Sequence, residues 1–220
     1  MIGRKKRDRE EGGAEDGSDV AAESVEGADE PEGLSPRPDG PWDLSERPDA
    51  REDEQMLDLG ALLIRGFDGL QMQVQMDEEM STVSLVTLSD EAGSLQVQAF
   101  AAPRSTGIWQ EIREQLATSI TGSGGLVEDR SGEFGVELSA RVPGQGGSLQ
   151  PARFVGVDGP RWFLRGLFYG SAATPDAAPR LERLFKDIVV DRGDEALPVG
   201  GPLPMRLPPT QAGSEVGDDS

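Results

Sequence analysis

The sequence predicts an α+β fold in which two amphipathic helices pack on an antiparallel β-sheet and disordered arms extend from both ends. Several segments alternate apolar and polar residues, which is typical of strands with one buried face. Two other segments repeat apolar residues at helical spacing. The 220 residues include 29 Gly and 16 Pro, too many for one compact domain from end to end, so we expect part of the chain to be unfolded.

The composition divides the chain into three predicted regions. Residues 1–54 form a disordered acidic tail with a basic start. Met1–Arg9 carries five basic side chains, whereas Glu10–Glu54 carries seventeen acidic side chains against three arginines. Such a segment buries too little apolar surface to offset its ordering entropy. Residues 55–193 form the folded domain, and residues 194–220 form a Pro/Gly-rich arm that ends in an acidic tail.

Both arms contain apolar residues that are suited to contact the domain. The lone tryptophan of the acidic tail, Trp42, is one candidate. The C-terminal arm has the composition of an extended, polyproline-like segment. It either lies on the domain through Leu203, Met205 and Leu207 or hangs free.

The first half of the predicted domain reads as strands. Met56–Ile64 is apolar enough for a buried strand or a short segment entering the domain. Leu70–Met76 and Leu95–Phe100 alternate strictly, and Ser81–Leu88 is rich in β-branched residues. Because short polar turns separate the last three, we expect them to form an antiparallel meander.

Two helices and a further strand region complete the predicted secondary structure. Ile108–Ile120 has an apolar stripe at helical spacing, with Ser105 or Thr106 as its N-terminal cap. In Leu126–Val142 the residues Phe134, Val136, Leu138, Ala140 and Val142 are predicted to share one buried face. The last helix starts at Thr174 or nearer Ala178 and ends by Ile188.

A β-hairpin is the most strongly predicted element. Arg153–Val157 and Arg161–Tyr169 read as two strands joined at Asp158-Gly159, because Asp-Gly supplies the positive φ angles of a tight turn. Side chains alternate along a strand. Trp162, Leu164 and Phe168 are therefore expected on one face, and Arg161, Phe163 and Arg165 on the other.

Composition excludes several chemistries. The formal net charge of −20 disfavours nucleic acid and anionic membranes as partners. The chain has no Cys and no His, which removes thiolate metal sites and the commonest general base. No calcium-loop spacing and no convincing pair of catalytic carboxylates occurs. We therefore expect no catalytic residues, no metal, no cofactor and no enzymatic activity.

The chain also shows no membrane-spanning or secretory segment. No apolar run approaches the length of a membrane span, and no apolar region follows the basic start as it would in a secretory signal. A cytoplasmic location without membrane contact is the expectation.

Several short motifs together resemble the actinobacterial domain-of-unknown-function family 3710. Their order along the chain is Gly40–Asp43, Asp58–Gly60, Gln98–Arg104, Gly135–Leu138, Gly156–Gly166 and Val189–Gly193. The resemblance spans about residues 40–210 and implies no activity or catalytic residue. The predicted architecture is also similar to the Mog1/PsbP-like fold of small accessory and binding proteins, which does not fix a function.

Three functions remain open. The first is a non-catalytic interaction or accessory protein whose sheet face or flexible arms engage another protein. The candidate binding residues are Arg161, Arg165 and Trp162, approached by Arg104 and Arg153, and the arginines are suited to contact an anion or acidic peptide. The alternative role for these arginines is cross-strand pairing with Glu133 and Glu137. The second function is a small-molecule-binding module with a pocket between sheet and helices, lined by Trp109, Trp162 and Phe168. The third is weak nucleic-acid binding through Met1–Arg9.

Overall fold

The described part of the chain forms two β-sheets and two α-helices. The computed structural model describes residues 37–77, 82–104, 106–144 and 147–207. The predicted disorder of residues 1–36 and the predicted acidic tail at residues 211–220 lie outside the described residues. Within them, the structure is the α+β arrangement that the sequence predicts.

The large sheet has seven antiparallel strands in the order β4-β5-β6-β10-β9-β8-β7. The predicted meander supplies three of them, because β4, β5 and β6 pair consecutively. β10 pairs with both β6 and β9, so the predicted hairpin occupies the middle of the sheet. The strands are β4 Gln71–Asp77, β5 Thr82–Asp90, β6 Gly93–Ala101, β7 Leu126–Gly132, β8 Gly135–Pro143, β9 Leu149–Gly159 and β10 Trp162–Tyr169.

A smaller sheet of four short strands has the order β1-β11-β3-β2. Its β1 runs parallel to β11, and the other neighbours are antiparallel. Two 3-10 helices, η1 Leu44–Glu46 and η2 Pro48–Arg51, connect β1 to β2. The strands are β1 Trp42–Asp43, β2 Met56–Asp58, β3 Leu62–Arg65 and β11 Val189–Val190.

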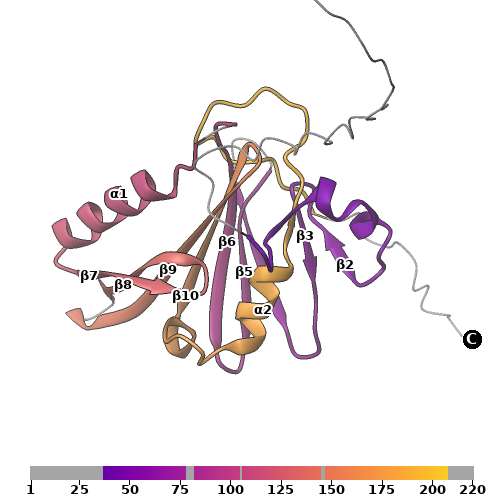
Figure 1. Cartoon of the computed structure of the whole chain (residues 1–220). Coiled ribbons are helices and arrows are strands. Elements are labelled where there is room, and N and C mark those ends of the chain that lie inside the picture. The colour runs from indigo at the N-terminus through magenta and orange to yellow at the C-terminus, as the bar shows by residue number, and fades with distance from the viewer. Residues whose placement is uncertain (1–36, 78–81, 105, 145–146, 208–220) are drawn as a thin grey trace, which may run out of the picture. The chain divides into compact units, whose positions relative to one another are not determined.

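The two helices cover opposite faces of the large sheet (Figure 1). On one face, Trp109 and Ile120 of α1 (Trp109–Gly122) pack on Phe154 and Phe163. On the other face, α2 (Pro179–Asp187) and the small sheet cover the core. That core contains Leu181, Leu184 and Phe185 of α2, Leu62, Ile64 and Val190 of the small sheet, and Trp162, Leu164 and Phe168 of β10.

Segments on both sides of the predicted domain, residues 55–193, pair with the sheets. Trp42 pairs with Val189 in the small sheet, as expected of a docking tryptophan. In the C-terminal arm, the Leu203 N–H donates to the Ala99 carbonyl at 2.9 Å, and Met205 accepts from the Val83 N–H at 3.0 Å. The arm therefore lies between β6 and β5 with Leu203 and Met205 buried, whereas Leu207 is exposed.

The hairpin turns two residues later than predicted. Asp158 and Gly159 belong to β9, and Gly159 pairs with Trp162. The turn is made by Pro160 and by Arg161, whose φ of 63° suits the third position of a type II turn. Pro160 has no N–H and cannot continue the ladder, and a Cβ at Gly159 would overlap the Trp162 ring. Side chains of β10 face as predicted, except that Arg161 is in the turn.

The predicted buried face of Phe134, Val136, Leu138, Ala140 and Val142 is wrong at its first two residues, because Phe134 lies on the other face and Val136 is 41% exposed. Gly135, with a φ of 88°, ends the turn between β7 and β8, and the alternation starts after it. Phe134 therefore packs in the core on the α2 face, whereas Leu138 packs beneath α1. Between them, Glu137 is buried on the α2 side although the sequence places it on the polar face.

The N-terminus of α1 is held by a residue distant in sequence. No described side chain of the preceding segment caps the helix, so the predicted cap at Thr106 is wrong, and the alternative cap Ser105 lies outside the described residues. Instead the buried Asp158 carboxylate accepts from the N–H groups of Ile108, at 2.8 Å, and Trp109, at 3.3 Å. Gly107 allows this approach, because a Cβ there would overlap the carboxylate. Burial raises the pKa of Asp158, and the two N–H groups oppose that rise.

We expect Asp158→Ala to lower the free energy of unfolding by roughly 2–4 kcal/mol, because two enclosed N–H groups lose their acceptor. Asp158→Asn retains one acceptor oxygen and should lose less. Urea unfolding measures both. Because the folded-state pKa is raised, the stability contributed by this carboxyl is greatest below its usual value of 3.8 and falls as pH rises through the folded-state pKa. A difference between wild type and Asp158→Asn that does not change with pH would contradict this account.

At the turn, Arg161→Gly should raise the free energy of unfolding by roughly 0.5–1 kcal/mol, because glycine adopts a positive φ without steric cost. The matched control is Arg104→Gly, which replaces an exposed arginine whose φ is not positive and should lower stability. Equal destabilisation by the two changes, measured by urea unfolding, would show that Arg161 is unstrained.

Candidate functional site

The structure separates the five residues predicted to bind a partner. Trp162 is fully buried, and its Nε1 donates to Asp43 at 2.8 Å. Arg165 is half-buried, bonds to the Gln98 side chain, and has a pKa lowered by burial. Arg161 is in the turn, and Arg104 is exposed with no polar partner among the described residues.

Arg153 lies on the opposite face of the sheet from Arg165. It pairs across the sheet with Phe168, whose ring its guanidinium covers at 4.4 Å. The acids proposed as partners for Arg161 and Arg165 are engaged elsewhere: Glu137 contacts Arg153, and Glu133 pairs with Lys186. The predicted arginines therefore do not form one binding surface.

The three aromatic residues proposed to line one pocket are also on different faces. Trp109 packs beneath α1 against Phe163, whereas Trp162 and Phe168 pack in the core that α2 covers. All three are buried. A pocket lined jointly by them is therefore not formed.

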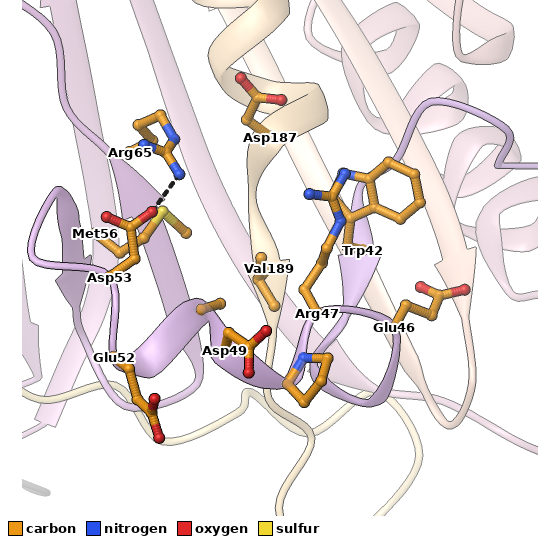
Figure 2. A pocket seen from close by; sticks show the side chains of 12 residues that line it. Trp42, Glu46, Arg47, Asp49, Glu52, Asp53, Met56, Arg65, Asp187 and Val189 are labelled. Atoms are coloured by element: carbon orange, nitrogen blue, oxygen red, sulfur yellow. Dashed lines mark hydrogen bonds and ion pairs between the residues drawn. The ribbon is translucent and has the colours of Figure 1, made fainter.

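The candidate functional site is a groove on the outer face of the small sheet, which we call the Trp42 groove (Figure 2). Its volume is about 460 Å³. The register sets Trp42 beside Val189 and Met56 beside Arg65, so one face of the sheet forms the floor. Its lining residues are Trp42, Glu46, Arg47, Pro48, Asp49, Ala50, Glu52, Asp53, Met56, Arg65, Asp187 and Val189.

Local capping builds the wall of the groove opposite the sheet. The Asp43 carboxylate accepts from the Ser45 N–H at 2.9 Å, and Glu46 accepts from the Asp43 N–H at 2.6 Å. This reciprocal capping box starts η1, and Pro48 starts η2 with its fixed φ. The Trp162 Nε1 bond to Asp43 anchors the same segment to the large sheet.

An aromatic ring in the groove already binds a guanidinium group. The guanidinium carbon of Arg47 lies over the Trp42 ring, 4.2 Å from its centroid. Arg47 is exposed and has no carboxylate partner in the described part of the chain. Because Trp is the aromatic side chain that attracts cations most strongly, this contact shows that the groove is suited to cationic groups.

The carboxylates of the groove fall into two classes. Glu46 is bound by Arg37 through two contacts of 3.0 Å, and Asp53 pairs with Arg65 at 2.5 Å. The Gln55 N–H and Arg65 lower the pKa of Asp53, which therefore stays ionised at neutral pH. By contrast, the side chains of Asp49, Glu52 and Asp187 have no ion pair or hydrogen bond to any described residue.

A second hollow, the Arg183 hollow, adjoins the groove and shares Arg65 and Asp187 with it. Its volume is about 330 Å³, and Phe67 and Leu184 line it. Arg180 covers the Phe67 ring at 4.0 Å and donates to the Asp68 carbonyl at 2.7 Å. Arg183 is exposed and has no partner among the described residues. The groove lining contains five carboxylates and two arginines, whereas the lining of the Arg183 hollow contains one carboxylate and three arginines.

The described residues show neither a metal centre nor a membrane-spanning helix. In residues 37–207, apart from the gaps named above, no group of three or more Asp, Glu, His or Cys is arranged to hold a metal ion. No helix in the same residues has the length and apolar content to cross a membrane.

Sequence reasoning missed the Trp42 groove because it assigned residues 37–54 to a disordered tail. Two local signals were present. Asp43 and Glu46 have capping-box spacing, and Pro48 occupies a typical first helical position. Both signals lie within an acidic stretch with few apolar residues, and the composition of that stretch led to the prediction of disorder.

Comparison with known proteins identifies one family. The family model described as "Protein of unknown function (DUF3710)" matches residues 40–214. This confirms the predicted family, while the actinobacterial origin stays a prediction. No curated protein matches the chain in sequence.

Two solved structures share a weak structural similarity with the chain. One is a crystal structure from Bacteroides thetaiotaomicron VPI-5482, with 12% identity, a TM-score of 0.37, and coverage of 64% of this chain and 49% of that one. The chain thus spans about half the length of that protein. The other is the solution structure of cyanobacterial PsbP (CyanoP) from Synechocystis sp. PCC 6803, with 13% identity, a TM-score of 0.36, and coverage of 59% and 86%. The second match agrees with the predicted PsbP-like resemblance, and neither carries a functional argument.

We expect Asp187→Asn to raise the free energy of unfolding by about 0.3–1 kcal/mol, because a carboxylate on the last residue of a helix opposes the helix dipole. The mirror-image control is Glu111→Gln in the first turn of α1, where the carboxylate is favourable and its loss should lower stability. Thermal and urea unfolding at low ionic strength measure both changes. If Asp187→Asn is destabilising, its carboxylate has a structural role that the contacts above do not show.

Proposed function

We propose that this chain, which belongs to the Protein of unknown function (DUF3710) family, is a non-catalytic interaction protein that binds a basic segment of a partner protein in the Trp42 groove. The single observation that carries the proposal is the Trp42 ring. It holds the Arg47 guanidinium at 4.2 Å, in a groove that is also lined by three carboxylates without a partner among the described residues. An arginine or lysine of a partner would exchange with Arg47 on the ring and pair with those carboxylates.

The adjoining Arg183 hollow supports a polypeptide partner over a single small cation. Besides the shared Arg65, it places two further arginines and the apolar side chains Phe67 and Leu184 next to the acidic groove. A segment with a basic residue followed by an apolar or acidic residue matches both hollows at once. Binding across two adjacent subsites raises affinity without requiring either subsite to be strong.

The charge of the whole chain favours the same class of partner. A formal net charge of −20 accelerates encounter with a basic protein and repels acidic ones. Since this effect is screened by salt, the association rate should be sensitive to ionic strength.

The charge state of Asp53 supports a binding role over a catalytic one. The lowered pKa of Asp53 keeps it charged, and a carboxylate that stays charged at neutral pH cannot act as a general acid. The lack of His and Cys in the chain also supports a non-catalytic role. The cytoplasmic location stays a prediction. Nucleic-acid binding through Met1–Arg9 also stays a prediction, because that segment lies outside the described residues.

The test is the affinity of a fluorescein-labelled peptide in which arginine and leucine alternate, measured by fluorescence anisotropy with the full chain. We expect Glu52→Gln/Asp187→Asn to weaken binding about fivefold to tenfold, because the exposed Glu52 and the half-buried Asp187 each contribute up to about 1 kcal/mol. Trp42→Phe leaves the net charge unchanged and should also weaken peptide binding, since Phe attracts cations less than Trp.

The matched control is Glu91→Gln/Asp194→Asn, which removes the same charges from exposed positions outside the groove. It should change the affinity by less than about twofold. Equal loss in both double variants would show that binding follows net charge and not the groove. Absence of any wild-type binding at low salt would reject the proposal outright.

A further inference from the structure

A third cavity lies on the α2 face of the large sheet, and none of its lining residues lines the Trp42 groove or the Arg183 hollow. We call it the Arg153 cavity. Its volume is about 330 Å³, within the range of small-ligand sites. It is bounded by β7, β8 and β9 of the sheet, by α2 and by the segment before α2. The lining residues are Arg130, Ser131, Gly132, Glu133, Glu137, Ser139, Arg153, Ala173, Pro175, Asp176 and Glu182.

Three ionisable side chains are buried together in the wall of this cavity. Arg153, Glu137 and Glu182 are only 4%, 3% and 7% exposed. The Arg153 guanidinium bonds to Glu182 through one terminal nitrogen and lies 3.5 Å from Glu137 through the other. Two buried carboxylates thus share a single buried cation.

The surrounding backbone holds both carboxylates in place. Glu137 accepts from the Phe134 N–H at 3.3 Å, and Glu182 accepts from the Asp176 N–H at 3.3 Å. Gly132 makes room for Glu137, because a Cβ at that position would overlap the carboxylate. The position of Glu137 therefore depends on a glycine and on a backbone N–H in a turn. Such fixed positioning is typical of a preorganised binding site.

The ion network of Arg153, Glu137 and Glu182 lacks a second positive charge. Buried charges in proteins are normally paired, and one carboxylate here lacks a cation of its own. The enclosed Nε of Arg153 also has no acceptor among the described residues. Burial raises the pKa of Glu137, and the charge of Arg153 only partly opposes that rise. One further positive charge at the cavity would balance the second carboxylate.

We infer that the Arg153 cavity binds a small organic amine, whose ammonium group pairs with Glu137 and Glu182. Carboxylates outnumber arginines in the lining by four to two, which disfavours an anionic ligand. A metal ion is disfavoured because no group of three or more suitable ligands occurs in the described part of the chain. The Ser131 and Ser139 hydroxyls line the cavity and can bind a polar atom elsewhere on the ligand.

The probe for this inference is ethanolamine, and ethylene glycol of nearly the same size is the neutral control. Two-dimensional NMR of the full chain at pH 7 should show saturable shifts of the Phe134 and Asp176 amide signals with ethanolamine and not with ethylene glycol. These amides bond to the two carboxylates, so they report on the cavity without any substitution. Equal shifts with both compounds, or none with ethanolamine, would overturn the inference.

Variants locate the binding. Glu137→Gln and Glu182→Gln should each weaken ethanolamine binding at least tenfold, whereas Glu133→Gln, whose carboxylate pairs with Lys186, should leave it within twofold. The groove variant Glu52→Gln/Asp187→Asn should bind ethanolamine as the wild type does. Loss of amine binding in the groove variant would contradict the cavity assignment. This inference is independent of the peptide interaction, since either can fail while the other holds.

Discussion

Burial of both faces of β9 and β10 is the constraint on which the rest of the structure depends. From Ala152 to Gly159 every residue of β9 is buried, and β10 buries Trp162, Leu164 and Phe168 on one side and Phe163 on the other. A strand apolar on both faces needs a layer on each side. Helix α1 supplies one layer, and α2 with the small sheet supplies the other. Any polar side chain on these strands must then find its partner inside the protein.

That requirement explains the two most unusual buried groups. Asp158 lies on the α1 side and is satisfied by the first N–H groups of that helix, where a negative charge is favourable. Arg153 lies on the α2 side and meets Glu137 from β8 and Glu182 from α2. The first arrangement uses the carboxylate fully and joins helix to sheet. The second leaves a carboxylate without its own cation beside a cavity, which is why one group is structural and the other is a candidate ligand site.

The segments at both ends of the described chain also cover parts of the two sheets. β5 and β6 pair only from Val86 and Val97 toward their connecting turn, so the far end of β6 would expose unpaired backbone groups. The C-terminal arm covers that end, with Leu203 bonded to Ala99 and Met205 to Val83. At the other end of the described chain, β1 forms an edge of the small sheet, and the two 3-10 helices that follow it cover the outer face of that sheet. They cover it only in part, and the space left over is the Trp42 groove.

The sequence by itself determined the elements whose signal is local. The period of two from Leu95 to Phe100 became β6, the helical spacing from Ile108 to Ile120 became α1, and the aromatic hairpin became β9 and β10. Only the tertiary structure decided how distant residues meet: Trp42 with Val189, Asp158 with the start of α1, and Arg153 with Glu182. The physical reason is that periodicity reports which face of an element is apolar, whereas pairing between elements depends on sheet order and register. Neither the groove nor the buried ion network could therefore be predicted from residue patterns alone.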